Sequence, residues 1–241
     1  MNNALFATLF GSPSLAQKYD AKVLATNPIA YYKLGETSGT TAVDSSGNGL
    51  DATYRNISLA QAKSPFNTNV PAFNGTNSDV LNNSAPFRSA FDGDEGFIFG
   101  WFRVSDVDVW SDGNNHYLFS ANYGFPNYAI YAYIEASPDN QITFRRNAGG
   151  QFDAVNHTTS QTDWFTAGIS WSVAEDEFKV YIDGAQVGTT QTGLASITGS
   201  LDFFIGSDLG GNGWDGNVGL VPIWDTPITD AQDPRLSLMT R

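Results

Sequence analysis

Short runs of alternating apolar and polar residues, separated by turn-forming residues, fill the chain from about Ile29 onward. One such run is residues 141–145, which follow the turn formers Pro138, Asp139 and Asn140. A period of two places successive side chains on opposite faces of a strand, as in a half-buried sheet. About a dozen runs of this kind, with no helices alternating between them, predict an all-β, antiparallel two-sheet sandwich.

Local signals also indicate where strands turn or break. Residues 164–171 and 178–182 form the clearest hairpin, and the Asp183-Gly184 pair that follows favours a tight turn whose twist matches the flanking strands. Pro222 interrupts the last apolar run and lacks a backbone N–H for the ladder. The closing strand is therefore expected to lie at a sheet edge or to contain a bulge.

The length of 241 residues suits one domain, since β-sandwiches of this size commonly fold as single units. We expect an N-terminal arm at residues 1–24 and a β-sandwich domain at residues 25–241. Residues 229–239 are expected to hold one short C-terminal helix, with Thr229 or Asp230 as its N-cap. The chain has no Cys, so disulfides and thiolate chemistry are excluded.

The N-terminal arm has no place in the expected sandwich. It carries four large apolar side chains, Leu5, Phe6, Leu9 and Phe10. No Lys or Arg precedes Lys18, whereas a signal peptide begins with a positive segment. We interpret the segment as an ordered arm that docks onto a partner protein or a sibling subunit. The alternative is a signal peptide that is removed after Ala16.

The charge balance narrows the range of partners. The chain carries 12 Lys and Arg against 25 Asp and Glu, a formal net charge of −13. Such a surface repels phosphate backbones and anionic lipid headgroups, so neither nucleic acid nor membrane is an expected partner. No apolar run reaches the roughly twenty residues that a membrane span requires.

Several segments together resemble laminin-G-like and pentraxin-like domains, which have the concanavalin A-like jelly-roll fold. The segments are residues 28–36 and 42–49, residues 72–75, residues 96–104, residues 164–184, and residues 205–206 with 214–224. They occur in the order of that family and extend over residues 28–229. The resemblance implies a concanavalin A-like jelly roll that binds a ligand.

The resemblance also raises the question of calcium, which laminin-G-like domains often bind near a Gly-rich turn. Asp44, Asn48 and Asp51 lie in and just after such a turn and could supply oxygen ligands. The alternative is that Asp44 and Asn48 only cap the turn through its backbone. Family members often carry an acidic pair where this chain has Gly219-Leu220, and this departure favours the capping role.

Catalysis is not expected. Glu175 and Glu177 are two residues apart, as in a catalytic carboxylate pair, but they belong to a contiguous acidic turn before Phe178. His116 and His157 are the only histidines and lie in polar segments typical of surface loops. No nucleophile-elbow or HExxH pattern occurs. We therefore expect a protein that binds rather than one that catalyses.

Sugar recognition is the most plausible use of aromatic residues in polar loops, because aromatic rings stack on the apolar faces of sugars. Trp110 and Trp214 lie beside loops rich in Gly and Asp, and Tyr123 lies near Pro126. These three aromatic residues are the expected ligand contacts.

Two functions fit this set of features. The first is a non-catalytic virion protein, a phage capsid or tail decoration displayed on the virion surface. It would dock through its arm onto a capsid or tail protein or a sibling subunit, and it could also bind cell-surface glycan. The alternative is a secreted, extracellular carbohydrate-binding lectin.

Overall fold

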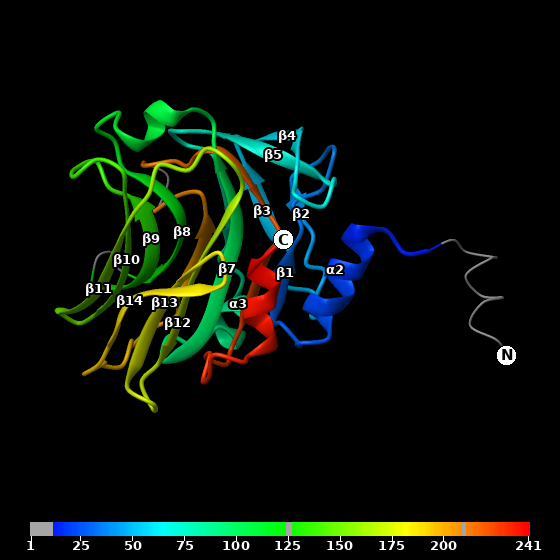
Figure 1. Cartoon of the computed structure of the whole chain (residues 1–241). Coiled ribbons are helices and arrows are strands. Elements are labelled where there is room, and N and C mark those ends of the chain that lie inside the picture. Colours follow the sequence, from blue (N-terminus) through cyan, green and yellow to red (C-terminus); the bar gives the residue numbers. More distant parts are fainter. Residues whose placement is uncertain (1–11, 124–126, 209–210) are drawn as a thin grey trace, which may run out of the picture.

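Two antiparallel β-sheets pack face to face, and short helices lie against one of them (Figure 1). The computed structural model describes residues 12–123, 127–208 and 211–241. Within these residues the nine-stranded sheet contains, in spatial order, β14 (Ala185–Gln191), β13 (Glu177–Ile182), β12 (Phe165–Ser172), β7 (Glu95–Val104), β16 (Asp215–Gly219), β5 (Asn69–Asn74) and β4 (Ser58–Lys63), with β17 (Val221–Trp224) also on β7 and β1 (Ala30–Tyr32) on β17. The eight-stranded sheet contains β11 (Gln151–Thr158), β10 (Gln141–Ala148), β9 (Tyr128–Ile134), β8 (His116–Tyr123), β15 (Asp202–Ile205), β6 (Asp79–Asn82), β3 (Ala52–Arg55) and β2 (Thr41–Ala42). The expected all-β two-sheet sandwich is confirmed.

The interior between the sheets is built from alternate residues of the strands. In β9, Ile130, Ala132 and Ile134 are fully buried in this core, and Ile98 and Phe102 of β7 join them. The intervening residues of each strand point to the outer face of their sheet, because side chains alternate along a strand. Each sheet thus buries one of its faces against the other sheet. The outer faces of the two sheets differ in what lies on them.

The hairpin predicted from Asp183-Gly184 is present between β13 and β14. Ile182 lies opposite Ala185, so the turn has two central residues. Asp183 has φ of 49° and Gly184 has φ of 79°. Two central residues with positive φ define the type I′ turn, whose twist matches that of the strands it joins.

The closing strand contains the bulge expected around Pro222. Gly219 of β16 lies opposite Trp101 of β7, and Ile223 of β17 lies opposite Ile98. From Gly219 to Ile223 the closing strand advances four residues, while β7 advances three from Trp101 to Ile98. The closing strand therefore contains one extra residue, which is a bulge. Leu220, with φ of 56°, separates the two halves. The strand is not an edge, since β17 lies between β1 and β7.

The outer face of the nine-stranded sheet is covered by helix α2 (Leu15–Leu24) and the 3₁₀ helix η2 (Pro234–Met239). Tyr19 and Val23 of α2 are buried there. The Tyr19 hydroxyl donates to Leu238 O at 2.9 Å and accepts from Trp101 Nε1 at 3.0 Å. Residues 15–24 therefore belong to the packed domain, which corrects the expected arm at residues 1–24. The docking residues Leu5, Phe6, Leu9 and Phe10 lie outside the described residues.

The C-terminal helix forms within the expected segment, but it is the 3₁₀ helix η2, and Asp233 caps it in place of Thr229 or Asp230. The remaining helices of the described chain are α3 (Ala85–Ala90) and the 3₁₀ helix η1 (Val107–Trp110). In the part of the chain that the structure describes, no helix is long and apolar enough to cross a membrane.

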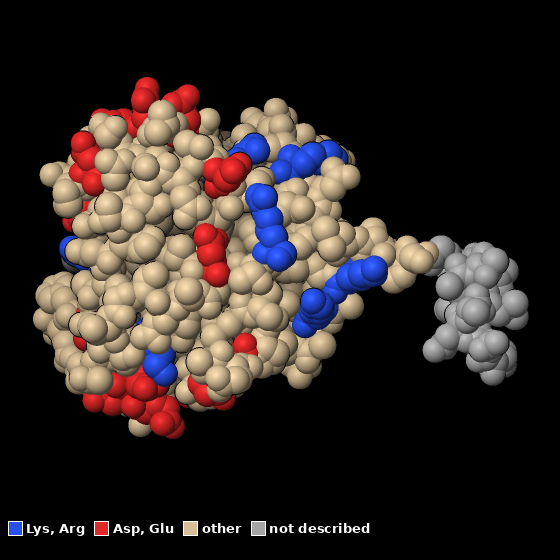
Figure 2. All heavy atoms as spheres, viewed as in Figure 1, with Lys and Arg blue, Asp and Glu red and all other residues tan. Residues whose placement is uncertain are grey.

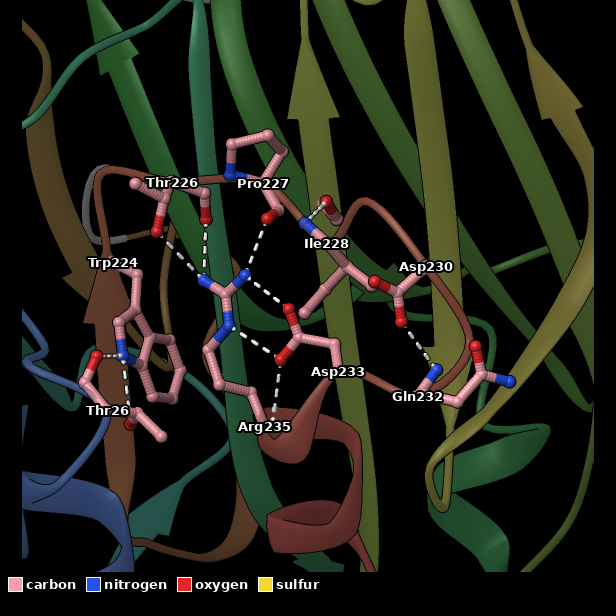
Figure 3. A network of polar contacts seen from close by, with 10 residues as sticks. Thr26, Trp224, Thr226, Pro227, Ile228, Asp230, Gln232, Asp233 and Arg235 are labelled. Atoms are coloured by element: carbon pink, nitrogen blue, oxygen red, sulfur yellow. Dashed lines mark hydrogen bonds and ion pairs between the residues drawn. The ribbon is translucent and has the colours of Figure 1, made fainter.

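Arg235 ties η2 to the preceding loop (Figure 3). Its Nη1 donates to Thr226 O at 2.8 Å and its Nη2 donates to Pro227 O at 2.5 Å. Nε donates to Asp233 Oδ1 at 2.9 Å, and the guanidinium lies 5.6 Å from the ring centres of both Phe97 and Trp224. This one buried side chain therefore fastens the C-terminal segment onto the outer face of the nine-stranded sheet.

Candidate functional site

Two of the three aromatic residues expected to contact a ligand are buried. Trp110 is 1% exposed and its Nε1 donates to Gln161 O at 3.0 Å. Trp214 is 0% exposed, packs edge-on against Phe102 and donates to Asn217 O at 3.3 Å. These indoles fill the end of the core, so this structure corrects their expected role. Tyr123 is 55% exposed and keeps its place as a candidate.

The turn that carries Asp44 is held by its own hydrogen bonds. Asp44 Oδ1 accepts from the Tyr31 N–H at 2.9 Å and the Ser46 N–H at 2.8 Å, and Oδ2 accepts from the Leu50 N–H at 3.0 Å. Asp51 Oδ1 accepts from the Asp44 N–H at 2.8 Å. The Asn48 amide donates to Ile29 O at 3.0 Å. This geometry fits the capping role, and calcium at Asp44, Asn48 and Asp51 stays a prediction from the sequence.

The two histidines are not in surface loops as expected. His116 is 2% exposed in β8, with Nδ1 2.9 Å from Gly213 O and Nε2 3.0 Å from Asp112 Oδ2. Burial would raise the pKa of Asp112, but hydrogen bonds from Asn114 and His116 outweigh it and lower that pKa. His157 lies in β11, where burial lowers its pKa. Among the described residues, no group of three or more His, Cys, Asp or Glu side chains could hold a metal ion.

The outer face of β8–β11 differs in composition from an ordinary solvent-facing sheet. The register aligns its outward residues in three rows across the four strands. The rows are Tyr117–Tyr133–Thr143–Asn156, Ser120–Tyr131–Arg145–Ala154 and Asn122–Ala129–Asn147–Phe152. We call these twelve residues the polar face. At about 4.8 Å between strands, each row extends roughly 14 Å.

Three tyrosines form the centre of the polar face. Tyr117 stacks on Tyr133 at 5.0 Å between ring centres and on Tyr131 at 5.8 Å. All three are buried, with exposed fractions of 4–6%. Burial is the main cause that raises the pKa of Tyr117, and it raises the pKa of Tyr133 to about 12 despite the opposing charge of Arg145. The hydroxyls of Tyr117 and Tyr133 therefore stay protonated at neutral pH and can donate as well as accept hydrogen bonds.

Glu135, at the end of β9, organises one border of the polar face. Its Oε2 accepts from Thr143 Oγ1 at 2.7 Å and from Gln141 Nε2 at 2.8 Å. Its Oε1 accepts from the Tyr133 hydroxyl at 3.3 Å and lies 3.9 Å from Arg145 Nη2. Arg145 also lies over the Tyr133 ring at 5.9 Å. The carboxylate and guanidinium keep 22% and 36% of their side chains exposed, so both can reach a ligand.

The opposite border of the polar face is the exposed edge strand β11. Phe152, Ala154 and Asn156 point outward from it and are exposed, and Phe152 has 62% of its surface free. Tyr123, at the end of β8, lies opposite Tyr128 and next to Asn122, so its side chain is on the other side of the sheet from Phe152. One exposed ring, that of Phe152, therefore marks this border, in one row with the buried amides of Asn147 and Asn122.

Only part of the polar face could be found from the sequence. The alternation in residues 128–134 already places Tyr131 and Tyr133 opposite the apolar residues of β9. Tyr117, Arg145 and Phe152 belong to other strands, and their positions beside these tyrosines depend on which strands pair. That pairing is a long-range property with no short sequence signal.

Comparison with known proteins establishes the family. A family model described as the concanavalin A-like lectin/glucanases superfamily matches residues 98–232. That is more than half of the chain, so the chain belongs to this superfamily, and the resemblance seen in the sequence is confirmed. No protein in the curated set matches the chain.

Two solved structures illustrate the fold. The botulinum neurotoxin serotype D binding domain has a TM-score of 0.63 at 15% identity, over 88% of this chain and 51% of that one. Domain 4 of AbnA, a GH43 extracellular arabinanase from Geobacillus stearothermophilus, in complex with arabinotriose, has a TM-score of 0.62 at 18% identity, over 87% of this chain and 98% of that one. The chain thus spans about half of the neurotoxin binding domain. At this identity the likeness establishes the fold alone.

Proposed function

We propose that the chain is a non-catalytic carbohydrate-binding domain and that the polar face is its binding surface. The observation that carries the proposal is the composition of this face. Eight of its twelve side chains are uncharged hydrogen-bonding groups, namely the three Tyr, three Asn, one Thr and one Ser. Seven of these eight are at most 6% exposed and form a buried polar layer, so the accessible part of the face consists of Asn156, Arg145, Ala154 and Phe152. The amide of Asn156 both donates and accepts and the guanidinium of Arg145 donates, which suits recognition of a hydroxyl-rich ligand.

The borders of the polar face complete this chemistry. Phe152 offers apolar ring surface on which the C–H face of a sugar can stack. Glu135 offers acceptors and Arg145 offers donors, and their mutual contacts hold both in place. The solved structure of the arabinanase domain with arabinotriose supports this proposal by analogy, since that domain has the same fold.

The arrangement of carboxylates supports a binding role without hydrolysis. Glycosidases use two carboxyl groups on either side of the scissile bond. Glu135 is held by hydrogen bonds from Thr143, Gln141 and Tyr133. Glu177 is ion-paired with Lys179 on the other sheet. The expected absence of catalysis is therefore part of the proposal.

The first test is a glycan array followed by titration of the best ligand. We expect Arg145→Gln and Phe152→Ser each to weaken that ligand about tenfold, since each removes a contact worth on the order of 1.4 kcal/mol. Val107→Ser is the matched control, because Val107 is also an exposed apolar residue, at 52%, but lies in η1. Unchanged affinity in both polar-face variants would contradict the proposal.

We propose further that the domain is displayed on a virus particle, with a secreted lectin as the alternative. The observation that favours display is the position of α2. The chain enters the domain on the outer face of the nine-stranded sheet, whereas the polar face is on the outer side of the other sheet. A partner bound by Leu5, Phe6, Leu9 and Phe10 would thus leave the polar face free.

Intact-mass analysis of purified virus particles from the source tests this display. We expect the full-length chain to copurify with the particles, and a variant that lacks residues 1–11 to fold but remain free. This deletion keeps Ser14 and Gln17, whose reciprocal hydrogen bonds cap α2. A free chain that has lost its first sixteen residues would instead establish the secreted lectin.

A further inference from the structure

A second polar cavity lies beside helix α2, away from the polar face. It has a volume of about 550 Å³ and opens between α2, the segment after β1 and the turn between β4 and β5. Its charged lining residues are Asp20, Lys33, Glu36 and Lys63. Asn67, Thr68 and Asn69 of the β4–β5 turn add uncharged polar groups.

The wall formed by the β4–β5 turn is fixed in place. Phe66 of the turn packs on Tyr19 of α2 at 4.1 Å between ring centres and meets Trp101 edge-on at 5.5 Å. Ser64 Oγ accepts from the Thr68 N–H at 3.2 Å. The Trp164 indole N–H donates to Lys63 O at 3.1 Å and so holds the end of β4. The cavity is therefore formed before a ligand arrives, which lowers the cost of binding.

Both carboxylates of the cavity already have partners. Asp20 accepts from the Tyr31 hydroxyl at 2.7 Å and from Lys33 Nζ at 3.3 Å. Glu36 accepts from the Tyr54 hydroxyl at 2.6 Å and from the Val43 N–H at 3.0 Å. Burial, with the nearby carboxylates, raises the pKa of both tyrosines, which therefore remain donors.

The two lysines are less fully engaged than the carboxylates. Lys33 keeps 43% of its side chain exposed beside its single ion pair. Lys63 Nζ donates to the neutral Asn69 Oδ1 at 2.6 Å. An ammonium group has three donors, so each lysine can still bind an anionic oxygen. Figure 2 shows Lys and Arg side chains gathered on the side of α2 and β4–β5, while most Asp and Glu side chains in this view lie elsewhere.

We propose that this cavity binds a carboxylate-bearing sugar unit of an acidic glycan, as a second site independent of the polar face. Lys33 and Lys63 hold the sugar carboxylate. The side chains of Asn67, Thr68 and Asn69 hydrogen-bond the sugar hydroxyls. The two carboxylates of the cavity balance its two lysines in number, but they already accept hydrogen bonds from Tyr31 and Tyr54, so the lysine donors remain for the anionic ligand.

The test uses a short oligogalacturonate and a neutral galactose oligomer of the same length, each titrated into the full chain and followed by NMR. We expect the oligogalacturonate to shift the amide signals of residues 67–69 and the neutral oligomer to leave them unchanged. Lys33→Gln and Lys63→Gln should each weaken the oligogalacturonate about tenfold or more. Lys22→Gln is the matched control, since Lys22 is an exposed lysine of α2 outside the cavity lining.

Two results would overturn the proposal. Equal binding of the neutral oligomer at residues 67–69 would mean that the carboxylate is not recognised. An equal loss in Lys22→Gln would mean that overall charge, not the cavity, attracts the ligand. Arg145→Gln separates this site from the polar face, because it should leave binding of the oligogalacturonate at the cavity unchanged. Thermal unfolding of each variant checks that the fold is retained.

Discussion

Replacing Arg235 with alanine should lower the free energy of unfolding by about 3–5 kcal/mol, the usual cost of removing one partner from a buried ion pair. The guanidinium is 7% exposed and donates to Thr226 O, Pro227 O and both oxygens of Asp233. Its loss leaves the Asp233 carboxylate, 12% exposed, with only the backbone N–H of residue 235 as a donor, and removes the cation beside the stacked rings of Phe97 and Trp224. Urea unfolding followed by tryptophan fluorescence measures the effect.

Arg88→Ala is the control for this loss. Arg88 is also ion-paired, to Asp202, but its side chain is 38% exposed, so its removal should change the midpoint little. Burial would raise the pKa of Asp233, but bonds from Arg235 outweigh it and lower that pKa. Asp233 therefore stabilises the fold at pH values above about 3.9, its pKa in the unfolded chain. This contribution is lost as the pH falls through the lower pKa that Asp233 has in the folded protein. Equal midpoints for Arg235→Ala and Arg88→Ala would show that Arg235 does not anchor the C-terminal segment.

The sequence predicted the strands better than it predicted the helix that packs against them. Alternation located β7 and the β12–β13 hairpin, and Asp183-Gly184 identified a turn that requires two positive φ angles. Helix α2 was missed, although Ser14 and Gln17 have the spacing of a capping box. Only two residues of α2, Tyr19 and Val23, are buried, so its apolar periodicity is weak.

The site was harder to predict than the fold because local polarity does not report burial. Trp110 and Trp214 lie in polar segments, yet their indole N–H groups find backbone carbonyls and their rings fill the core. The polar face combines residues of four strands, and no single segment contains enough of it to be recognised. Arg145 and Phe152 come to lie on one face only through the pairing of β10 with β11.

Gly216→Ala should be among the most destabilising single substitutions in the chain. Gly216 has φ of 145°, and a Cβ built on it would lie 2.1 Å from Arg103 O and 2.9 Å from Ser105 N, both backbone atoms. The backbone of β7 cannot yield without breaking its ladder with β16. Overpacking costs about 1–3 kcal/mol, and an unfavourable φ adds about 1–3 kcal/mol. We expect the free energy of unfolding to fall by a total on the order of 4 kcal/mol, measured by thermal or urea unfolding.

Gly47→Ala separates the two causes of this loss. Gly47 also has a positive φ, 96°, but a Cβ there would meet nothing within 4 Å. Its substitution should therefore cost only the conformational strain of about 1–3 kcal/mol. The excess loss in Gly216→Ala then measures how closely β16 approaches β7 at the bulged closing strand. If the two variants lose the same stability, the close approach of these two backbones is not what requires glycine at position 216.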